Sequence, residues 1–193
     1  MGRPRAFDEI AVLTGAMEAF RREGYFAVSI KDLEEATGLK AGSIYNSYGD
    51  KAGLFRAATT HYLCVVLHQR IADHAPEAAG LSGLRSLFVS LLHEPGGTSY
   101  GCLITNTAVE FACDDSAPVD VGDGLRVLSE TFNNRLLAAR RAGLLRSELK
   151  PAQCASKLLA LYQGVLVLVR AGWDKTALEK MIDSEFNQLG AKS

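Results

Sequence analysis

Residues 39–48 carry side chains whose types suit the reading of a nucleic-acid groove. Apolar residues recur there at helical spacing, so Leu39, Ile44 and Tyr48 can face inward. This leaves a set of small and polar residues toward solvent: Ala41, Ser43, Tyr45, Asn46 and Ser47. Hydroxyl and amide groups bind phosphate oxygens and base edges. The stretch therefore suits a surface that contacts double-stranded DNA, although a packed helical cap over residues 1–62 with a solvated polar face would give the same pattern.

Two short helices around a tight turn must position these side chains. Ser29 and Asp32 have the spacing of a capping box, which predicts a helix over residues 30–37 that ends at Gly38. A second short helix is predicted over residues 40–48. This arrangement is typical of a helix-turn-helix motif, whose second helix enters the major groove.

Helical periodicity also dominates the rest of the chain, and no stretch shows the alternation of a β-strand. An apolar stripe from Ile10 to Phe20 predicts a first helix that ends at Gly24 with a left-handed cap. The further predicted helices, several of which begin at a capping Asp or a Pro, cover residues 51–74, 84–93, 102–112, 121–143, 151–171 and 174–189. We therefore predict an all-α fold of about nine helices. Residues 1–62 would form a helix-turn-helix domain with its motif at about residues 29–48, and residues 63–193 a larger helical domain.

The N-terminal residues resemble the TetR/AcrR family of bacterial transcriptional regulators. The family signature is a Gly-Tyr pair, a Ser/Thr cap and a Gly-Val-Ser-x-Gly-Thr-Leu-Tyr-x-x-Phe-x-x-Lys-x-x-Leu run. Gly24-Tyr25, Ser29 and residues 38–54 match it, and the family's spacing is kept over residues 3–62. The resemblance implies a ligand-responsive regulator, most often a repressor, with a C-terminal domain for ligand binding and dimerisation.

The resemblance also implies which residues touch DNA. The matching positions are Ser29, Ala41, Ser43, Tyr45, Ser47 and Lys51. Hydroxyls, helix N-termini and a Lys cation are phosphate ligands, which agrees with these roles. We add Arg5, which like Arg3 lies on a leader that can reach phosphates or the minor groove, and Gly42 and Asn46 on the recognition helix. Asn46 can pair with N6 and N7 of adenine, at about 1–3 kcal/mol of discrimination.

Departures from the family pattern prevent any inference of the operator sequence. Lys40 replaces the usual Ser cap of the recognition helix, and Glu34 stands where a small residue commonly packs against that helix. Asn46 and Ser47 replace a common aromatic-His pair.

A homodimer is predicted from the apolar stretch between Leu158 and Val169, because a helix that is apolar on nearly every face must be enclosed on more than one side. Reading a two-fold operator also requires two recognition helices about 34–36 Å apart, which one copy cannot supply. As in the family, the last two helices would pair with their symmetry mates. The predicted interface comprises Leu158, Leu161, Gly164, Val165, Leu168, Met181 and Phe186.

A ligand pocket is predicted among aromatic and apolar residues of the C-terminal helices, although plain core packing would give the same pattern. The candidate residues are Tyr62, Phe88, Leu92, Cys102, Phe111, Phe132, Tyr162 and Leu166. By resemblance, an unidentified small-molecule inducer would bind there and shift the fourth helix. The run from Gly101 to Asn106 resembles a helix start at which some family members sense electrophiles or oxidants, so Cys102 is either such a sensor or a small buried core thiol.

Whole-chain composition excludes several classes of protein and indicates the compartment. The chain is 48% hydrophobic and 22% charged, which excludes a disordered or collagen-like protein. A net charge of −1 does not by itself indicate a nucleic-acid or membrane-surface binder. The longest apolar run is shorter than the roughly 20 residues of a membrane helix, and no cleavable signal peptide is recognisable. Four cysteines without a CxxC pair suit a reducing compartment, so we expect a cytoplasmic protein that does not act at a membrane.

Two alternatives remain open at this point. The chain has no nucleophile elbow, HExxH, P-loop or GxGxxG motif, so we expect neither enzymatic activity nor a cofactor, and a small all-α enzyme is one alternative. The other is a thiol- or metal-sensing cytoplasmic protein that does not bind DNA. His61, Cys64 and His68 would share one helical face and could bind zinc or copper, but a fourth ligand is not apparent and we expect no metal.

Overall fold

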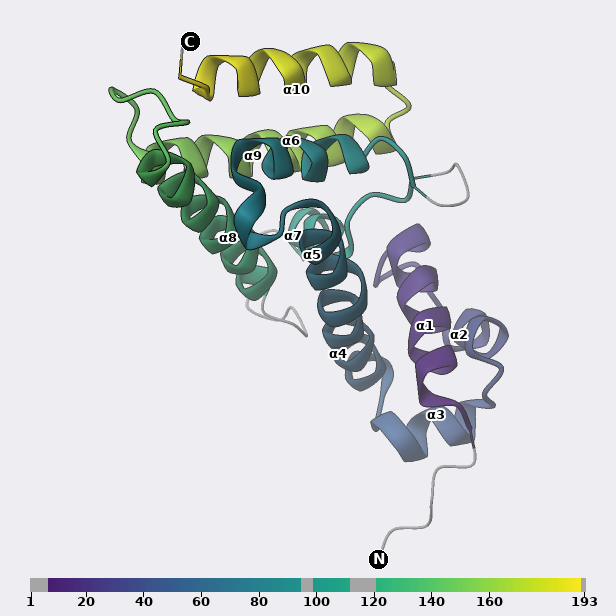
Figure 1. The fold of residues 1–193 in the computed structure, drawn as a ribbon. Coiled ribbons are helices and arrows are strands. Elements are labelled where there is room, and N and C mark those ends of the chain that lie inside the picture. Colours follow the sequence, from purple (N-terminus) through teal and green to yellow (C-terminus); the bar gives the residue numbers. More distant parts are fainter. Residues whose placement is uncertain (1–6, 95–98, 112–120, 192–193) are drawn as a thin grey trace, which may run out of the picture. The chain divides into compact units, whose positions relative to one another are not determined.

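The computed structural model describes residues 7–94, 99–111 and 121–191 (Figure 1). Within these residues the secondary structure is helical, apart from one isolated antiparallel bridge between Leu145 and Gly190. The predicted all-α fold is confirmed. The chain divides into two compact units, Met1–Leu67 with Cys102–Val121, and His68–Gly101 with Gly122–Ser193.

The first unit is built around a small aromatic and aliphatic core. Its helices are α1 (Glu9–Glu23), α2 (Ile30–Thr37), α3 (Ala41–Tyr48), α4 (Lys51–Tyr62) and α7 (Leu103–Phe111). Helix α1 packs against α2, α4 and α7, and α3 packs against α2 and α4. Phe20, Leu33, Ile44 and Phe55 fill the core, each with at most 1% of its surface exposed. The packing of α7 against the N-terminal helices was not anticipated from the sequence, which separated them at residue 62.

The predicted capping residues begin their helices as expected. Ser29 accepts a hydrogen bond from the backbone N–H of Asp32, and the Asp32 carboxylate accepts one from the Ser29 backbone, which completes the capping box of α2. Asp50 caps α4 by accepting from the Gly53 N–H over 2.6 Å. Asp174 caps the last helix in the same way. Each cap satisfies backbone donors that have no partner within the helix.

A π-helical segment interrupts the long helix that the sequence predicts over residues 51–74. This segment, Leu63–His68, lies between α4 and α5 (Gln69–His74). Hydrogen bonds from i to i+5 change the angular phase, so α-helical spacings no longer define a common face there. His61 instead lies 3.0 Å from the hydroxyl of Thr14 on α1. Among the described residues, no three His, Cys, Asp or Glu side chains are grouped so that they could hold a metal ion.

The second unit has an aromatic centre. Its remaining helices are α6 (Gly80–Ser90), α8 (Val121–Arg141), α9 (Pro151–Arg170) and α10 (Lys175–Leu189), with a 3₁₀ turn at Glu77–Ala79. Phe88 of α6 lies between 5.2 and 5.6 Å, centroid to centroid, from the rings of Phe132, Tyr162 and Phe186. Offset and edge-to-face contacts of this kind stabilise a core beyond the area that they bury.

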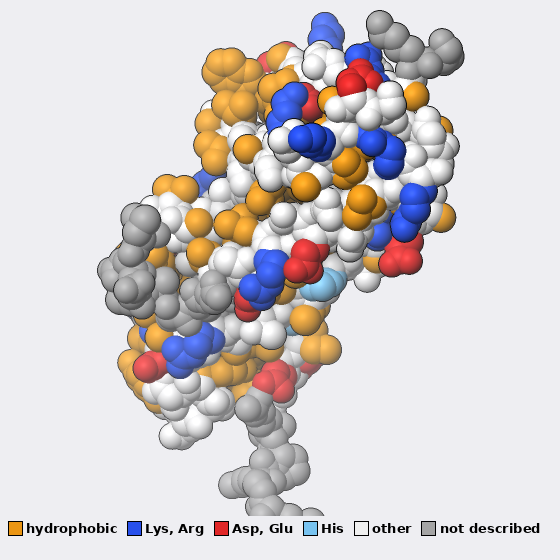
Figure 2. All heavy atoms as spheres, turned by 90° about the vertical axis from the view of Figure 1, so that its left-hand side faces the viewer, with side chains coloured by type: hydrophobic (Ala, Val, Ile, Leu, Met, Phe, Trp, Pro, Cys, Tyr) orange, Lys and Arg blue, Asp and Glu red, His pale blue; other side chains and the backbone are white. Residues whose placement is uncertain are grey.

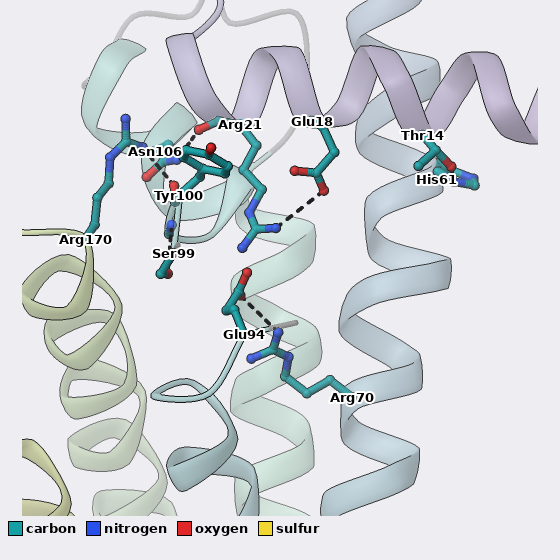
Figure 3. A network of polar contacts seen from close by, with 11 residues as sticks. Thr14, Glu18, Arg21, His61, Arg70, Glu94, Ser99, Tyr100, Asn106 and Arg170 are labelled. Atoms are coloured by element: carbon teal, nitrogen blue, oxygen red, sulfur yellow. Dashed lines mark hydrogen bonds and ion pairs between the residues drawn. The ribbon is translucent and has the colours of Figure 1, made fainter. Parts of the chain in front are cut away.

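Ion pairs and hydrogen bonds of charged side chains connect segments of the second unit at its surface. Arg85 of α6 pairs with Asp183 of α10 over 2.6 Å. Arg70 of α5 pairs with Glu94 over 3.1 Å, and Arg170 donates to the backbone carbonyl of Tyr100 (Figure 3). On the face drawn in Figure 2, acidic and basic side chains are interspersed.

Helix α9 is long and apolar enough to cross a membrane by length and composition alone. This was not anticipated from the sequence, in which the central apolar run of the helix is shorter than a membrane span. The core helix of a soluble protein passes the same test. Leu158 and Val165 of α9 are fully buried within the second unit, as expected for a helix that contributes to a core.

Candidate nucleic-acid interface

The recognition helix α3 presents a polar face opposite a single buried anchor. Ile44 is completely buried, whereas Ser43 and Asn46 are exposed and Tyr45 is 49% exposed. Gly42 is exposed, and a Cβ atom there would meet nothing within 4 Å. Of the other predicted contacts on this helix, Ala41 and Ser47 are half-buried. The exposed donors and the open backbone at Gly42 allow close approach of a ligand to this face.

A side chain from α2 caps the recognition helix. Lys40, at the capping position, makes no side-chain hydrogen bond to the helix. Instead, the Ala41 backbone N–H donates to Glu34 Oε1 over 2.7 Å. The carboxylate therefore lies at the positive end of the helix dipole, where a phosphate would otherwise be favoured. The two departures from the family pattern at residues 34 and 40 are thus coupled in this chain.

Ser29 is engaged within its own capping box. Its hydroxyl donates to Asp32 Oδ2 over 2.6 Å and accepts from the Asp32 N–H over 3.2 Å. The hydrogen bonds from the Ser29 side chain and then its backbone hold the pKa of the Asp32 carboxyl below its usual range. A phosphate bound by the Ser29 hydroxyl would have to compete with that carboxylate.

Lys51, at the start of α4, rests on an aromatic ring. Its Nζ lies 4.8 Å from the centroid of the Tyr25 ring, within the range of a cation–π interaction. Burial lowers the pKa of Lys51, and the carboxylates of Glu110 and Asp32 oppose that shift. Burial also raises the pKa of Tyr25, with a further contribution from Asp50.

Glu110 of α7 binds the backbone next to this aromatic ring. Its carboxylate accepts from the N–H of Tyr25 over 2.8 Å and from that of Phe26 over 2.7 Å. Gly24 has φ 90° and ψ 164°, so it has the predicted positive φ but not the left-handed helical conformation. A Cβ atom on Gly24 would lie 3.0 Å from Glu110 Oε1. The Gly-Tyr pair therefore provides both a backbone conformation and the space for a carboxylate.

A second polar contact from α7 reaches the end of α1. Asn106 donates through Nδ2 to the backbone carbonyl of Arg21 over 3.1 Å (Figure 3). Asn106 and Glu110 are four residues apart, so they share one face of α7. Glu110 was not anticipated from the sequence, in which its i, i+4 spacing from Asn106 indicates only that the two residues share a helix face.

Arg5, the remaining predicted DNA contact, lies outside the described residues.

The predicted pocket residues divide between the two units. All eight are buried, with at most 5% of their surface exposed. Phe88, Phe132 and Tyr162 pack on one another in the second unit. Phe111, in contrast, lies in the first unit, where its ring centroid is 4.8 Å from that of Phe26. Cys102, a buried free thiol, directly precedes α7. The assignment of these residues to a ligand pocket stays a prediction.

A surface hollow of about 510 Å³ lies beside the end of α8, lined by Arg140, Gly143, Leu145, Arg146, Ser147, Glu148 and Ala191. None of the predicted pocket residues contributes to it. Arg140 uses its guanidinium there to donate to the backbone carbonyls of Arg146 and Leu149. These hydrogen bonds hold the loop between α8 and α9 against the end of α8.

The predicted dimer residues fall on two sides of their helices. Leu158 and Val165 are fully buried and Phe186 is 7% exposed, so these three pack inside the protomer. Their assignment to an outer interface needs correction, because the sequence could not show which phase of an apolar helix faces the core. Leu161 and Leu168 are half-buried, whereas Gly164 and Met181 are exposed.

Comparison with known proteins identifies the family of this chain. Residues 12–58 match the family described as bacterial regulatory proteins, tetR family, and residues 80–184 match the tetracyclin repressor-like C-terminal domain. The HTH-type transcriptional repressor ComR of Escherichia coli (strain K12) is 30% identical over 188 residues, which cover 94% of this chain and 87% of ComR.

Solved structures have the same fold. A cysteine mutant of the TetR family regulator CifR, complexed with 26-bp double-strand operator DNA, aligns with a TM-score of 0.81 at 25% identity, over 97% of this chain and 100% of CifR. A TetR regulator from Chloroflexus aurantiacus J-10-FL aligns with a TM-score of 0.80 at 24% identity, over 94% of this chain and 95% of that chain. The chain belongs to the TetR family of bacterial transcriptional regulators.

Proposed function

We propose that this protein is a ligand-responsive transcriptional repressor that binds a two-fold operator as a homodimer and is released by a small molecule. The observation that carries the proposal is the geometry of α3. Ile44 anchors this helix in the core while Ser43, Tyr45 and Asn46 face outward. The names of relatives support the direction of regulation, since both ComR and AcnR of Corynebacterium efficiens are transcriptional repressors.

In this proposal the DNA contacts divide by type. Tyr45, Ser47 and Lys51 bind phosphates, and the open backbone at Gly42 allows a phosphate to approach α3. Asn46 is the residue that reads a base, through a bidentate contact to adenine. Ser29 contributes less than the resemblance implies, because its hydroxyl is already bound to Asp32.

The dimer in this proposal uses the outer face of α9 and α10. Ala160, Gly164 and Val167 are exposed along one stripe of α9, and Val167 is 50% exposed. A Cβ atom at Gly164 would meet nothing within 4 Å, so the backbone there is open to close approach by another helix. Met181 extends the apolar surface onto α10. Burial of this stripe in a second copy would enclose α9 on both sides.

The inducer site and the place of action are also part of the proposal. The inducer binds among the C-terminal helices and favours a conformation with weaker operator affinity, so its effect is limited by its preference between the two states. The protein acts in the cytoplasm, where its DNA target lies, and it performs no catalysis.

Titration against operator DNA tests the proposal. Purified protein is added to labelled DNA from the regions flanking its own gene, and to a genomic fragment library, with excess nonspecific competitor at two salt concentrations. We expect tight, salt-sensitive binding that resists the competitor. Asn46→Ala should weaken binding and relax preference at one base pair, whereas Gln153→Ala, an exposed change on α9, should not. Absence of competitor-resistant binding to any genomic fragment would overturn the proposal.

A further inference from the structure

Glu110 holds a two-residue stretch of backbone beside the proposed DNA-binding surface. Its two carboxylate oxygens accept separately from Tyr25 and Phe26, at 2.8 and 2.7 Å. Hydrogen bonds to a charged acceptor are stronger than neutral ones, and two of them on successive amides fix the orientation of the backbone. Gly24 leaves room for this carboxylate, as a Cβ atom there would lie 3.0 Å from Oε1.

The ring of Tyr25 is held from several sides. Its centroid lies 5.0 Å from that of Phe55 on α4 and 5.3 Å from that of Phe111 on α7. Lys51 lies over the ring, with Nζ 4.8 Å from the centroid. The ring face therefore defines where the Lys51 ammonium rests before DNA arrives. A flexible Lys side chain that is already placed loses less conformational freedom when it binds a phosphate.

We propose that Glu110 is a positioning residue for operator binding: by fixing the backbone of Tyr25 and Phe26, it sets the aromatic face that presents Lys51 to a DNA phosphate. The inference rests on the proposed DNA-binding function and deepens it. Glu110 does not touch DNA in this account and acts through Tyr25 and Lys51. Helix α7 thereby takes part in setting operator affinity, although it lies far along the chain from the recognition helix.

A purely electrostatic role for Glu110 predicts the opposite sign. Its carboxylate acts to raise the pKa of Lys51 against the effect of burial, and a negative charge near the interface repels phosphates. If charge alone mattered, Glu110→Gln would tighten operator binding and Glu110→Asp would leave it unchanged. If positioning dominates, both variants weaken binding. Asp is too short to reach both amides, and the NH₂ group of Gln cannot accept a hydrogen bond from the second backbone N–H.

The experiment measures the operator dissociation constant of the full-length protein for Glu110→Asp, Glu110→Gln, Lys51→Met and the double variant of Glu110→Asp with Lys51→Met, across a range of salt. We expect Glu110→Asp and Glu110→Gln to bind about three- to five-fold more weakly. Lys51→Met should reduce the slope of log K against log salt by about 1 per protomer. Glu110→Asp should reduce that slope in the same direction.

The double variant tests whether Glu110 acts through Lys51. When Glu110 acts through Lys51, adding Glu110→Asp to Lys51→Met changes affinity by less than about two-fold, because the shared interaction has already been lost. Glu35→Gln, which removes an exposed carboxylate from the same unit, controls for net charge. Thermal unfolding of each variant in the absence of DNA identifies any variant that has lost its fold.

The outcomes separate the inference from the proposed function. Additive losses in the double variant, or an unchanged salt slope for both Glu110 variants, would overturn the positioning role while leaving operator binding intact. Tighter binding by folded Glu110→Gln would also overturn it. If wild-type protein bound no operator at all, the proposed function itself would fail.

Discussion

Glu34 and Ala41 are joined by a hydrogen bond of 2.7 Å from the Ala41 backbone N–H to Glu34 Oε1. The first helix of the helix-turn-helix motif thus caps the second. Lys40 provides no cap of its own. The angle between α2 and α3 is therefore fixed by a side chain as well as by the αL conformation of Gly38, which has φ 71° and ψ 1°.

Removing this cap should destabilise the protein. We expect Glu34→Ala to lower the free energy of unfolding by about 1 kcal/mol, the usual effect of losing a helix cap. Urea denaturation followed by circular dichroism measures the change. Lys40→Ser added to Glu34→Ala should restore part of the loss, because Ser at the capping position can accept from the N–H of Gly42 or Ser43 and so supplies a different cap for α3. Glu35→Ala, at the exposed neighbouring position, is the matched control. Equal stability of Glu34→Ala and Glu35→Ala would contradict the cap.

The capping box of α2 predicts a dependence of stability on acid pH. The pKa of Asp32 is lowered in the folded protein by its hydrogen bonds with Ser29. The ionised carboxylate thus stabilises the fold above the unfolded pKa of about 3.9, and this contribution is lost as pH falls through the lower folded value. The stability difference between wild type and Asp32→Ala should be constant from neutral pH to about pH 5 and shrink below pH 4. A difference that stays constant down to pH 2 would contradict this assignment.

Local signals in the sequence predicted local structure well. The capping box of Ser29 and Asp32 places the start of α2 correctly, and the helical periodicity around Ile44 gives the exposed face of α3. Both signals depend only on residues within a few positions of one another. Glu110 was missed because its partners, Tyr25 and Phe26, are 85 and 84 residues away. No helical pattern of α7 specifies those partners.

The face of α9 that packs into the protomer core was missed for a different reason. Leu158 and Val165 are as apolar as the exposed Val167, so composition gave no indication of which stripe faces the protomer core. Only the neighbouring helices decide this. The π-helical segment Leu63–His68 likewise cannot be read from residue types, because it changes the hydrogen-bond register without changing helical propensity.

Gly24 should be far less tolerant of a side chain than another glycine with positive φ. Its φ of 90° and ψ of 164° lie in a region that is essentially restricted to glycine, and a Cβ atom would contact Glu110. We expect Gly24→Ala to cost about 1–3 kcal/mol. Gly38→Ala should cost about 1 kcal/mol, since Gly38 has an αL conformation and nothing lies within 4 Å of its added Cβ. Chemical denaturation of both variants compares them, and an equal cost would contradict the close approach of the carboxylate.

Gly164 offers a test of the dimer that leaves the protomer intact. It is exposed in the middle of α9, and a Cβ atom there would meet nothing within 4 Å in the same chain. Gly164→Trp should therefore fold normally, and removing a mid-helix glycine favours the helix by about 0.5–1 kcal/mol. A large ring on a closely packed interface between two helices would force the backbones apart, so we expect sedimentation velocity to show monomers and operator affinity to fall. Gln153→Trp, on an exposed turn at the start of the same helix, should remain dimeric. A dimeric Gly164→Trp with wild-type operator affinity would place the interface elsewhere on the protein.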